Sequence, residues 1–145
     1  MKKKFLFVLL SGFFSIVSYA NCVVSASPIN FGIYNPIRNE EGFTSSTFAV
    51  NCENTQTTYT MKLLPEAGAR VRDRQLNNTK AGSKDVLTYN LFLDSARNIY
   101  FGDGTSGTSF FTGSAVSVPI YARIAPRQKV GVGFYTNTVN FEVSF

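Results

Sequence analysis

The fold class is indicated most clearly by the stretch TNTVNFEVSF, residues 136–145. Apolar side chains at Val139, Phe141, Val143 and Phe145 alternate with polar ones, and this period of two is typical of a β-strand that buries one face. Terminal residues are usually poorly ordered unless they pack against the rest of a domain. The pattern therefore predicts a strand at the end of the chain whose apolar face needs a covering layer.

The same alternation recurs in short segments separated by clusters of Gly, Asn, Asp and Pro. The segments are TSSTFAVNC at 44–52, TTYTMKLL at 57–64, DVLTYNLFLD at 85–94 and AVSVPIYARI at 115–124. Many short strands at this spacing, with almost no helix-favouring run, are typical of an antiparallel β-sandwich. Because proline has no N–H to donate to a strand ladder, Pro119 predicts an edge or a bulge in the last segment.

The first 20 residues have the organisation of a secretory signal peptide. MKKK is a basic n-region, the 13 residues at 5–17 are an apolar h-region, and Ser18 and Ala20 supply the small residues of a cleavage site. The apolar run is shorter than the roughly 20 residues that a membrane-spanning helix needs. We therefore expect cleavage after Ala20, one domain at residues 21–145, and no membrane span after cleavage.

The two cysteines, Cys22 and Cys52, both lie in the expected mature chain. An even cysteine count in an exported protein favours a disulfide and an oxidising compartment, with two free buried thiols as the alternative. Removing the three lysines of the n-region from the 14 basic residues leaves 11 against 9 acidic ones, a net charge of +2. So small a charge does not indicate a nucleic-acid partner or an anionic membrane.

The composition argues against an enzyme. There is no histidine, so the commonest general base and metal ligand is missing, and Ser-His-Asp or Cys-His systems cannot be built. A paired-carboxylate glycosidase is the remaining alternative. GDGTSG at 102–107 has the letters of a dinucleotide fingerprint, but no helix or βαβ unit surrounds it, which predicts a simple turn. We expect no catalytic residue, no metal and no cofactor.

Two further clusters have both a structural and a functional interpretation. RVRDR at 70–74 places three arginines at alternate positions, so on a strand they would share one solvated face, with an acidic partner as the alternative. Phe110 and Phe111 follow the GDGTSG turn. Two aromatic residues at a loop tip form a candidate contact site, and the alternative is that they begin the next strand and face the core.

Four stretches also match one protein family in their order and spacing. They are CVVSASPINFGIYNP at 22–36, FAVNCEN at 48–54, LTYNLFLDSARNIYFGDGTSGT at 87–108 and VPIYARIAPRQKVGVGFYTNTVNFEVSF at 118–145. Together they resemble the spore coat protein U family, which includes the subunits of archaic (Csu-type) chaperone–usher pili. The resemblance covers essentially the whole mature chain.

This resemblance implies an incomplete immunoglobulin-like sandwich that lacks its final strand. In such subunits a periplasmic chaperone lends a strand, which a neighbouring subunit later replaces by β-strand addition. Val139, Phe141, Val143 and Phe145 would then line the groove and contact the chaperone. The implied partners are the chaperone, an outer-membrane usher and other pilus subunits, and the implied role is adhesion or biofilm formation at the cell surface after passage through the periplasm.

Two expectations follow for the role of the chain. Only Asn21 would precede Cys22 after cleavage, so we expect a chain that accepts a strand and has no obvious segment to donate. The alternative function is a monomeric secreted or periplasmic binding module, such as a carbohydrate binder or a small inhibitor. Its fold would be closed, and loop aromatics such as Phe110 and Phe111 would make its contacts.

Overall fold

The computed structural model describes residues 21–66, 68 and 70–145, so the predicted signal peptide lies outside the described residues. Within them the strands are β1 (Cys22–Ala26), β2 (Gly42–Cys52), β3 (Tyr59–Leu63), β4 (Arg74–Asn78), β5 (Val86–Phe92), β6 (Phe111–Gly113), β7 (Ser117–Ile124), β8 (Tyr135–Thr136) and β9 (Phe141–Ser144). In this part of the chain, no helix has the length and apolar character needed to cross a membrane.

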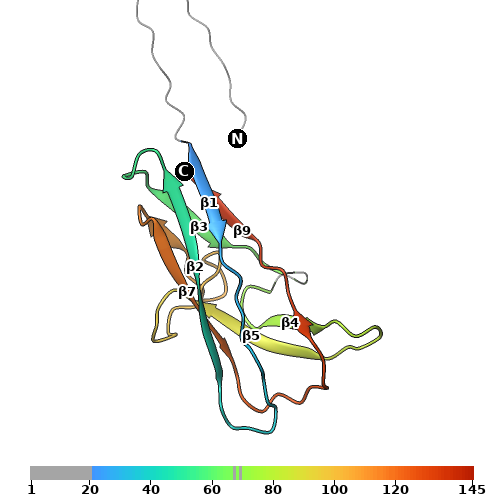
Figure 1. The fold of residues 1–145 in the computed structure, drawn as a ribbon. Coiled ribbons are helices and arrows are strands. Elements are labelled where there is room, and N and C mark those ends of the chain that lie inside the picture. The colour runs from blue at the N-terminus through green and yellow to red at the C-terminus, as the bar shows by residue number, and fades with distance from the viewer. Residues whose placement is uncertain (1–20, 67, 69) are drawn as a thin grey trace, which may run out of the picture.

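The strands form two sheets in which every pairing is antiparallel (Figure 1). The larger sheet has the order β1-β2-β7-β5-β4-β8, and the smaller has the order β6-β3-β9. Alternate side chains of both sheets point into one shared core, as the period-two pattern requires. The predicted all-β, immunoglobulin-like sandwich is confirmed.

The core contains most of the apolar residues that the alternating segments predicted, but Val116, in the phase of Val118 and Ile120, is 49% exposed. In β7 the buried side chains are Val118, Ile120, Ala122 and Ile124. The remaining core residues, contributed mostly by β2, β3 and β5, are Phe48, Val50, Tyr59, Met61, Leu63, Leu87, Tyr89, Leu91 and Phe101. One continuous cluster between the two sheets therefore forms the core.

Pro119 lies where β7 has a partner on one side only. It stands opposite Thr47 of β2, while the pairing of β7 with β5 ends at Tyr121. Because the Val50 N–H donates to the Val116 carbonyl at 2.9 Å, the alternation of the ladder points the Pro119 nitrogen away from β2. The missing N–H therefore leaves no gap in the ladder, and the predicted edge position is confirmed.

The prediction that the three arginines of RVRDR share a solvated face is wrong. Asp73 has a φ of 53°, which interrupts the strand alternation and turns Arg74 into the core, where it is 1% exposed. Its guanidinium donates to the Leu64 carbonyl from Nη1 at 3.1 Å and Nη2 at 3.2 Å. Its Nε lies 3.4 Å from Glu66 Oε1, and the Glu66 side chain is 11% exposed. A buried ion pair therefore replaces the expected charged surface.

The predicted disulfide between Cys22 and Cys52 is present. The two residues are directly opposite each other in the β1–β2 ladder, so the bond fastens the edge strand β1 to the sheet. The GDGTSG segment is a turn, as predicted. The Asp103 carboxylate accepts hydrogen bonds from the Thr105 hydroxyl at 2.6 Å and the Thr105 N–H at 2.9 Å, which lower the pKa of that carboxyl.

Candidate functional site

The last strand, β9, has an unpaired edge. Its partner is β3, where Phe141 stands opposite Leu63, and the Leu64 N–H donates to the Asn140 carbonyl at 2.9 Å. In an antiparallel ladder this alternation directs the backbone groups of Phe141 and Val143 away from β3. Among the strands that the structure describes, none pairs with that side of β9. These backbone groups are therefore available to another strand.

A groove runs beside this edge, between two segments that we call its walls. The N-terminal wall is residues 26–36, which follow β1, and the C-terminal wall is residues 130–141, which lead into β9. A cavity of about 640 Å³ lies between residues 29–36 and 130–137, and one of about 380 Å³ lies between residues 26–31 and 137–141. Both cavities are lined by Ile29, Phe31, Leu76 and Asn137. These shared residues make the two cavities one groove.

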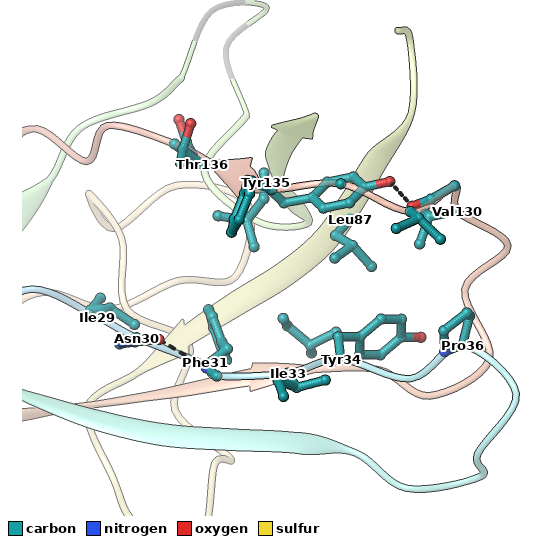
Figure 2. Close-up of a pocket in the computed structure, with 18 residues that line it drawn as sticks. Ile29, Asn30, Phe31, Ile33, Tyr34, Pro36, Leu87, Val130, Tyr135 and Thr136 are labelled. Carbon is teal, nitrogen blue, oxygen red and sulfur yellow. Dashed lines mark hydrogen bonds between the residues drawn. The ribbon is translucent and has the colours of Figure 1, made fainter. Parts of the chain in front are cut away.

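Core side chains form the floor of the groove. Leu87 and Ile124 lie under the larger cavity, and Tyr89 and Ile120 lie under the smaller one. Figure 2 shows Phe31 and Tyr34 on one wall, Val130 and Tyr135 on the other, and Leu87 between them. The groove therefore opens directly onto the hydrophobic core of the sandwich.

Each wall is anchored to the body of the domain. On the N-terminal wall, the Tyr34 hydroxyl donates to the Ala125 carbonyl at 3.1 Å and accepts the Gln128 N–H at 2.7 Å. On the C-terminal wall, the Tyr135 hydroxyl accepts a hydrogen bond from Asn78 Nδ2 at 3.1 Å, and the Gly131 N–H donates to the Asp85 carboxylate at 3.1 Å. No hydrogen bond found among the described residues joins one wall to the other. In the described residues, each wall is therefore hydrogen-bonded to the body of the domain rather than to the opposite wall.

Large apolar side chains project from the rim of the wider end. Ile33 on one wall and Val132 on the other are fully exposed, and Phe134 is 83% exposed. Their neighbours in the walls line the larger cavity. Single exposed apolar residues are common, but several around one apolar groove indicate a surface that another molecule covers.

Two of the residues predicted from the terminal strand pattern line the groove. Val139 and Phe141 line the smaller cavity, and the Phe141 ring lies 5.2 Å from the Phe48 ring. Val143 is half-buried against the core beyond the cavity. Phe145 is 60% exposed, at 6.1 Å from the Tyr59 ring. Val143 and Phe145 thus continue the same face of the chain outside the two cavities.

The adjacent aromatics Phe110 and Phe111 lie in different surroundings. Phe111 begins β6, stands opposite Met61 of β3 and packs at 5.5 Å from the Tyr59 ring. Phe110 is 43% exposed, with Lys62 Nζ 5.2 Å from the centre of its ring. Of the two candidate contact residues, Phe110 is the one whose ring faces solvent.

One groove residue, Asn137, was missed by the sequence reasoning. Its Nδ2 donates to the Glu66 carboxylate and, at 2.9 Å, to the Tyr89 hydroxyl. Burial raises the pKa of that Tyr89 hydroxyl, while the nearby Arg74 guanidinium opposes the shift. The signal that would have found Asn137 is its position two residues before Val139, in the same alternating phase.

Comparisons with known proteins agree with this architecture. Residues 12–142 match the family model described as the Spore Coat Protein U domain. Protein U of Myxococcus xanthus is 34% identical over 130 residues, which cover 81% of this chain and 71% of that protein.

A similar solved structure is the chaperone–tip adhesion subunit pre-assembly complex from archaic chaperone-usher Csu pili of Acinetobacter baumannii. The match to one chain of that complex has a TM-score of 0.54 at 19% identity, and it covers 88% of this chain and 40% of that one. At this identity the likeness concerns the fold. The present chain spans two fifths of the length of that structural neighbour.

Proposed function

The chain belongs to the Spore Coat Protein U family, and from this premise we propose that it is an exported structural subunit or accessory protein of an archaic chaperone–usher pilus or surface coat. In this proposal its sandwich is incomplete, and a β-strand from another chain completes it. The observation that carries the proposal is the groove between the two walls, which exposes core side chains beside the unpaired edge of β9.

An extended segment from another chain satisfies both features of this groove. Its backbone hydrogen-bonds to the outward-facing groups of Phe141 and Val143, and its alternate side chains enter the cavities, as in β-strand addition. If the groove stays empty, the unpaired apolar edge can pair with other chains and cause aggregation. A chaperone that occupies the groove until assembly removes this hazard, and a strand from a neighbouring subunit replaces it in the fibre or coat.

The family and the disulfide support an exported protein. We extend this to cleavage of a signal peptide after Ala20, folding in the periplasm, passage through an outer-membrane usher, and a role in adhesion or biofilm formation at the cell surface. The mass of the exported protein tests the first steps. We expect an N-terminus at Asn21 and a mass two hydrogens below that of the fully reduced chain.

The central test is expression of the full chain with its signal, with and without its cognate chaperone. We expect little soluble protein without the chaperone, a stable complex with it, and release of the chaperone when an added donor-strand peptide completes the fold. A soluble monomer that unfolds in one cooperative step without chaperone or peptide would refute the incomplete fold.

A second candidate function is a monomeric binding module for a small ligand such as a carbohydrate. The observation that favours it is the cavity of about 640 Å³, which falls within the range of about 300–1,000 Å³ typical of small-molecule sites. In that case the chain would be soluble alone, and a ligand rather than a peptide would raise its unfolding temperature. The same expression experiment separates the two functions.

A further inference from the structure

The C-terminal wall presents one amide among apolar and aromatic side chains. Tyr135, Asn137, Val139, Phe141 and Val143 are the half-buried residues of alternating phase, and the residues between them are exposed. Asn137 lies where the two cavities meet, because it lines both. The middle of the groove therefore carries one polar side chain, beside the apolar Ile29, Phe31 and Leu76 that also line both cavities.

The orientation of the Asn137 amide is fixed by its buried partners. Glu66 pairs with the buried Arg74, and an ionised carboxylate can only accept hydrogen bonds. The amide must therefore turn Nδ2 toward Glu66 and the Tyr89 hydroxyl. Oδ1 is left as an acceptor, and it accepts no hydrogen bond from any residue in the described part of the chain. It is not among the fully buried unpaired atoms, so solvent in the groove reaches it.

We infer that Asn137 sets the register of the entering strand. The strand places a side chain that carries a hydrogen-bond donor, the hydroxyl of Ser or Thr or the amide of Asn or Gln, against Asn137 Oδ1. Apolar side chains two residues to either side enter the cavities of about 640 Å³ and 380 Å³. This inference rests on the proposed function, and it adds the sequence feature that a partner strand must carry.

The physical basis is the cost of a mismatched register. An entering strand removes water from the groove, so an apolar side chain opposite Asn137 would leave Oδ1 buried without a donor. Such a loss lowers affinity by roughly 5- to 150-fold. A slip of one residue reverses the two faces of the strand, and a slip of two residues moves an apolar side chain onto Asn137. Each incorrect register is therefore penalised.

The test measures how tightly the full chain, released from its chaperone, binds a panel of labelled peptides by fluorescence anisotropy. Each peptide has about 11 residues, long enough for a strand of ordinary length, with polar residues on one face and Val on the other. Thr replaces Val at one inward position at a time, because the two side chains have nearly the same shape and differ in the hydroxyl. The same panel is applied to the variants Asn137→Leu and Asn140→Leu.

We expect one Thr position to bind roughly 5- to 150-fold more tightly than the all-Val peptide, the fold-change of one satisfied buried acceptor. Asn137→Leu should abolish this preference. Asn140→Leu should keep it, because the Asn140 side chain points out of the groove and is exposed. A purely structural role of Asn137 would weaken all peptides alike and leave the preference intact.

The outcomes separate this inference from the proposed function. If the peptides bind but Thr confers no advantage at any position in the unmodified chain, the register inference is wrong and strand acceptance stands. This comparison needs no protein variant, so it remains decisive even if Asn137→Leu does not fold. If no peptide binds at all, both the proposed function and the register inference fail.

Discussion

Replacing the buried arginine tests whether an ion pair supports the floor of the groove. Arg74 is 1% exposed, and Arg74→Met removes two hydrogen bonds to the Leu64 carbonyl and the partner of Glu66. Methionine fills much of the volume, so the main cost is the carboxylate left buried without a counter-ion. Breaking a buried pair in this way typically costs about 3–5 kcal/mol. We expect the free energy of unfolding to fall by about that amount.

The assay is urea denaturation of the periplasmically expressed chain, bound to a saturating donor-strand peptide and followed by far-UV circular dichroism. With a slope of about 2 kcal/mol per molar urea, a loss of about 4 kcal/mol lowers the midpoint by about 2 M. Adding Glu66→Gln should recover at least half of the loss. The neutral amide needs no counter-ion and still presents an oxygen to Asn137.

The matched control is Arg72→Met on the same segment. Its guanidinium lies 3.7 Å from the centre of the Tyr100 ring. The residue as a whole is half-buried, and its Nε is buried without a hydrogen-bond partner among the described residues, so its removal should cost about 0.5–1 kcal/mol. The reasoning is refuted if Arg74→Met costs no more than Arg72→Met. It is also refuted if the double variant of Arg74 and Glu66 loses the full sum of the two single changes.

Three further predictions concern the disulfide, the groove and the effect of pH. Replacing Cys22 and Cys52, which are 30 positions apart, with serine should lower the free energy of unfolding by about 3–4 kcal/mol; a change below about 1 kcal/mol in the same urea assay would contradict the loop-closure account. Phe141→Asp should abolish co-purification with the chaperone, whereas Glu142→Ala, on the exposed face, should not; equal retention would place the binding surface elsewhere. Burial raises the pKa of Tyr89, so the unfolded state loses its proton first and stability should fall as pH rises above about 10; an unchanged alkaline slope in Tyr89→Phe would exclude this residue as the cause.

Strands with strict alternation were predictable from sequence because side-chain burial alone specifies them. In β5, for example, Leu87, Tyr89 and Leu91 are buried as their spacing requires. The groove was predictable only through the family resemblance. Nothing in the local pattern of residues 26–36 shows that this segment leaves the sheet after Ala26 and becomes a wall.

The polar network was not predictable, because two rules of sequence reading fail there. Charged residues are rarely buried, so RVRDR was interpreted as a surface, and the positive φ of Asp73 that turns Arg74 inward has no reliable sequence signal for a residue other than glycine. Asn137 was missed because it is polar, so in the sequence the apolar alternation of the last strand begins only at Val139. Its burial depends on partners at Glu66 and Tyr89, which are 71 and 48 positions away.

The incomplete sandwich that we propose faces a physical problem that these polar residues address. Closing an open apolar groove would lower the free energy of the chain, because the two walls would then bury each other's side chains. Here the C-terminal wall is tied through Asn137 to Glu66 and the buried Tyr89, and the N-terminal wall is tied through Tyr34 to the segment that follows β7. The disulfide fixes the strand that leads into the N-terminal wall. Bonds of this kind are directional, so they specify where each wall lies in a way that apolar contact does not. The Asn137 amide then has two roles on its two polar atoms: Nδ2 ties the wall to Glu66 and Tyr89, and Oδ1 is the acceptor that, in our inference, the entering strand matches.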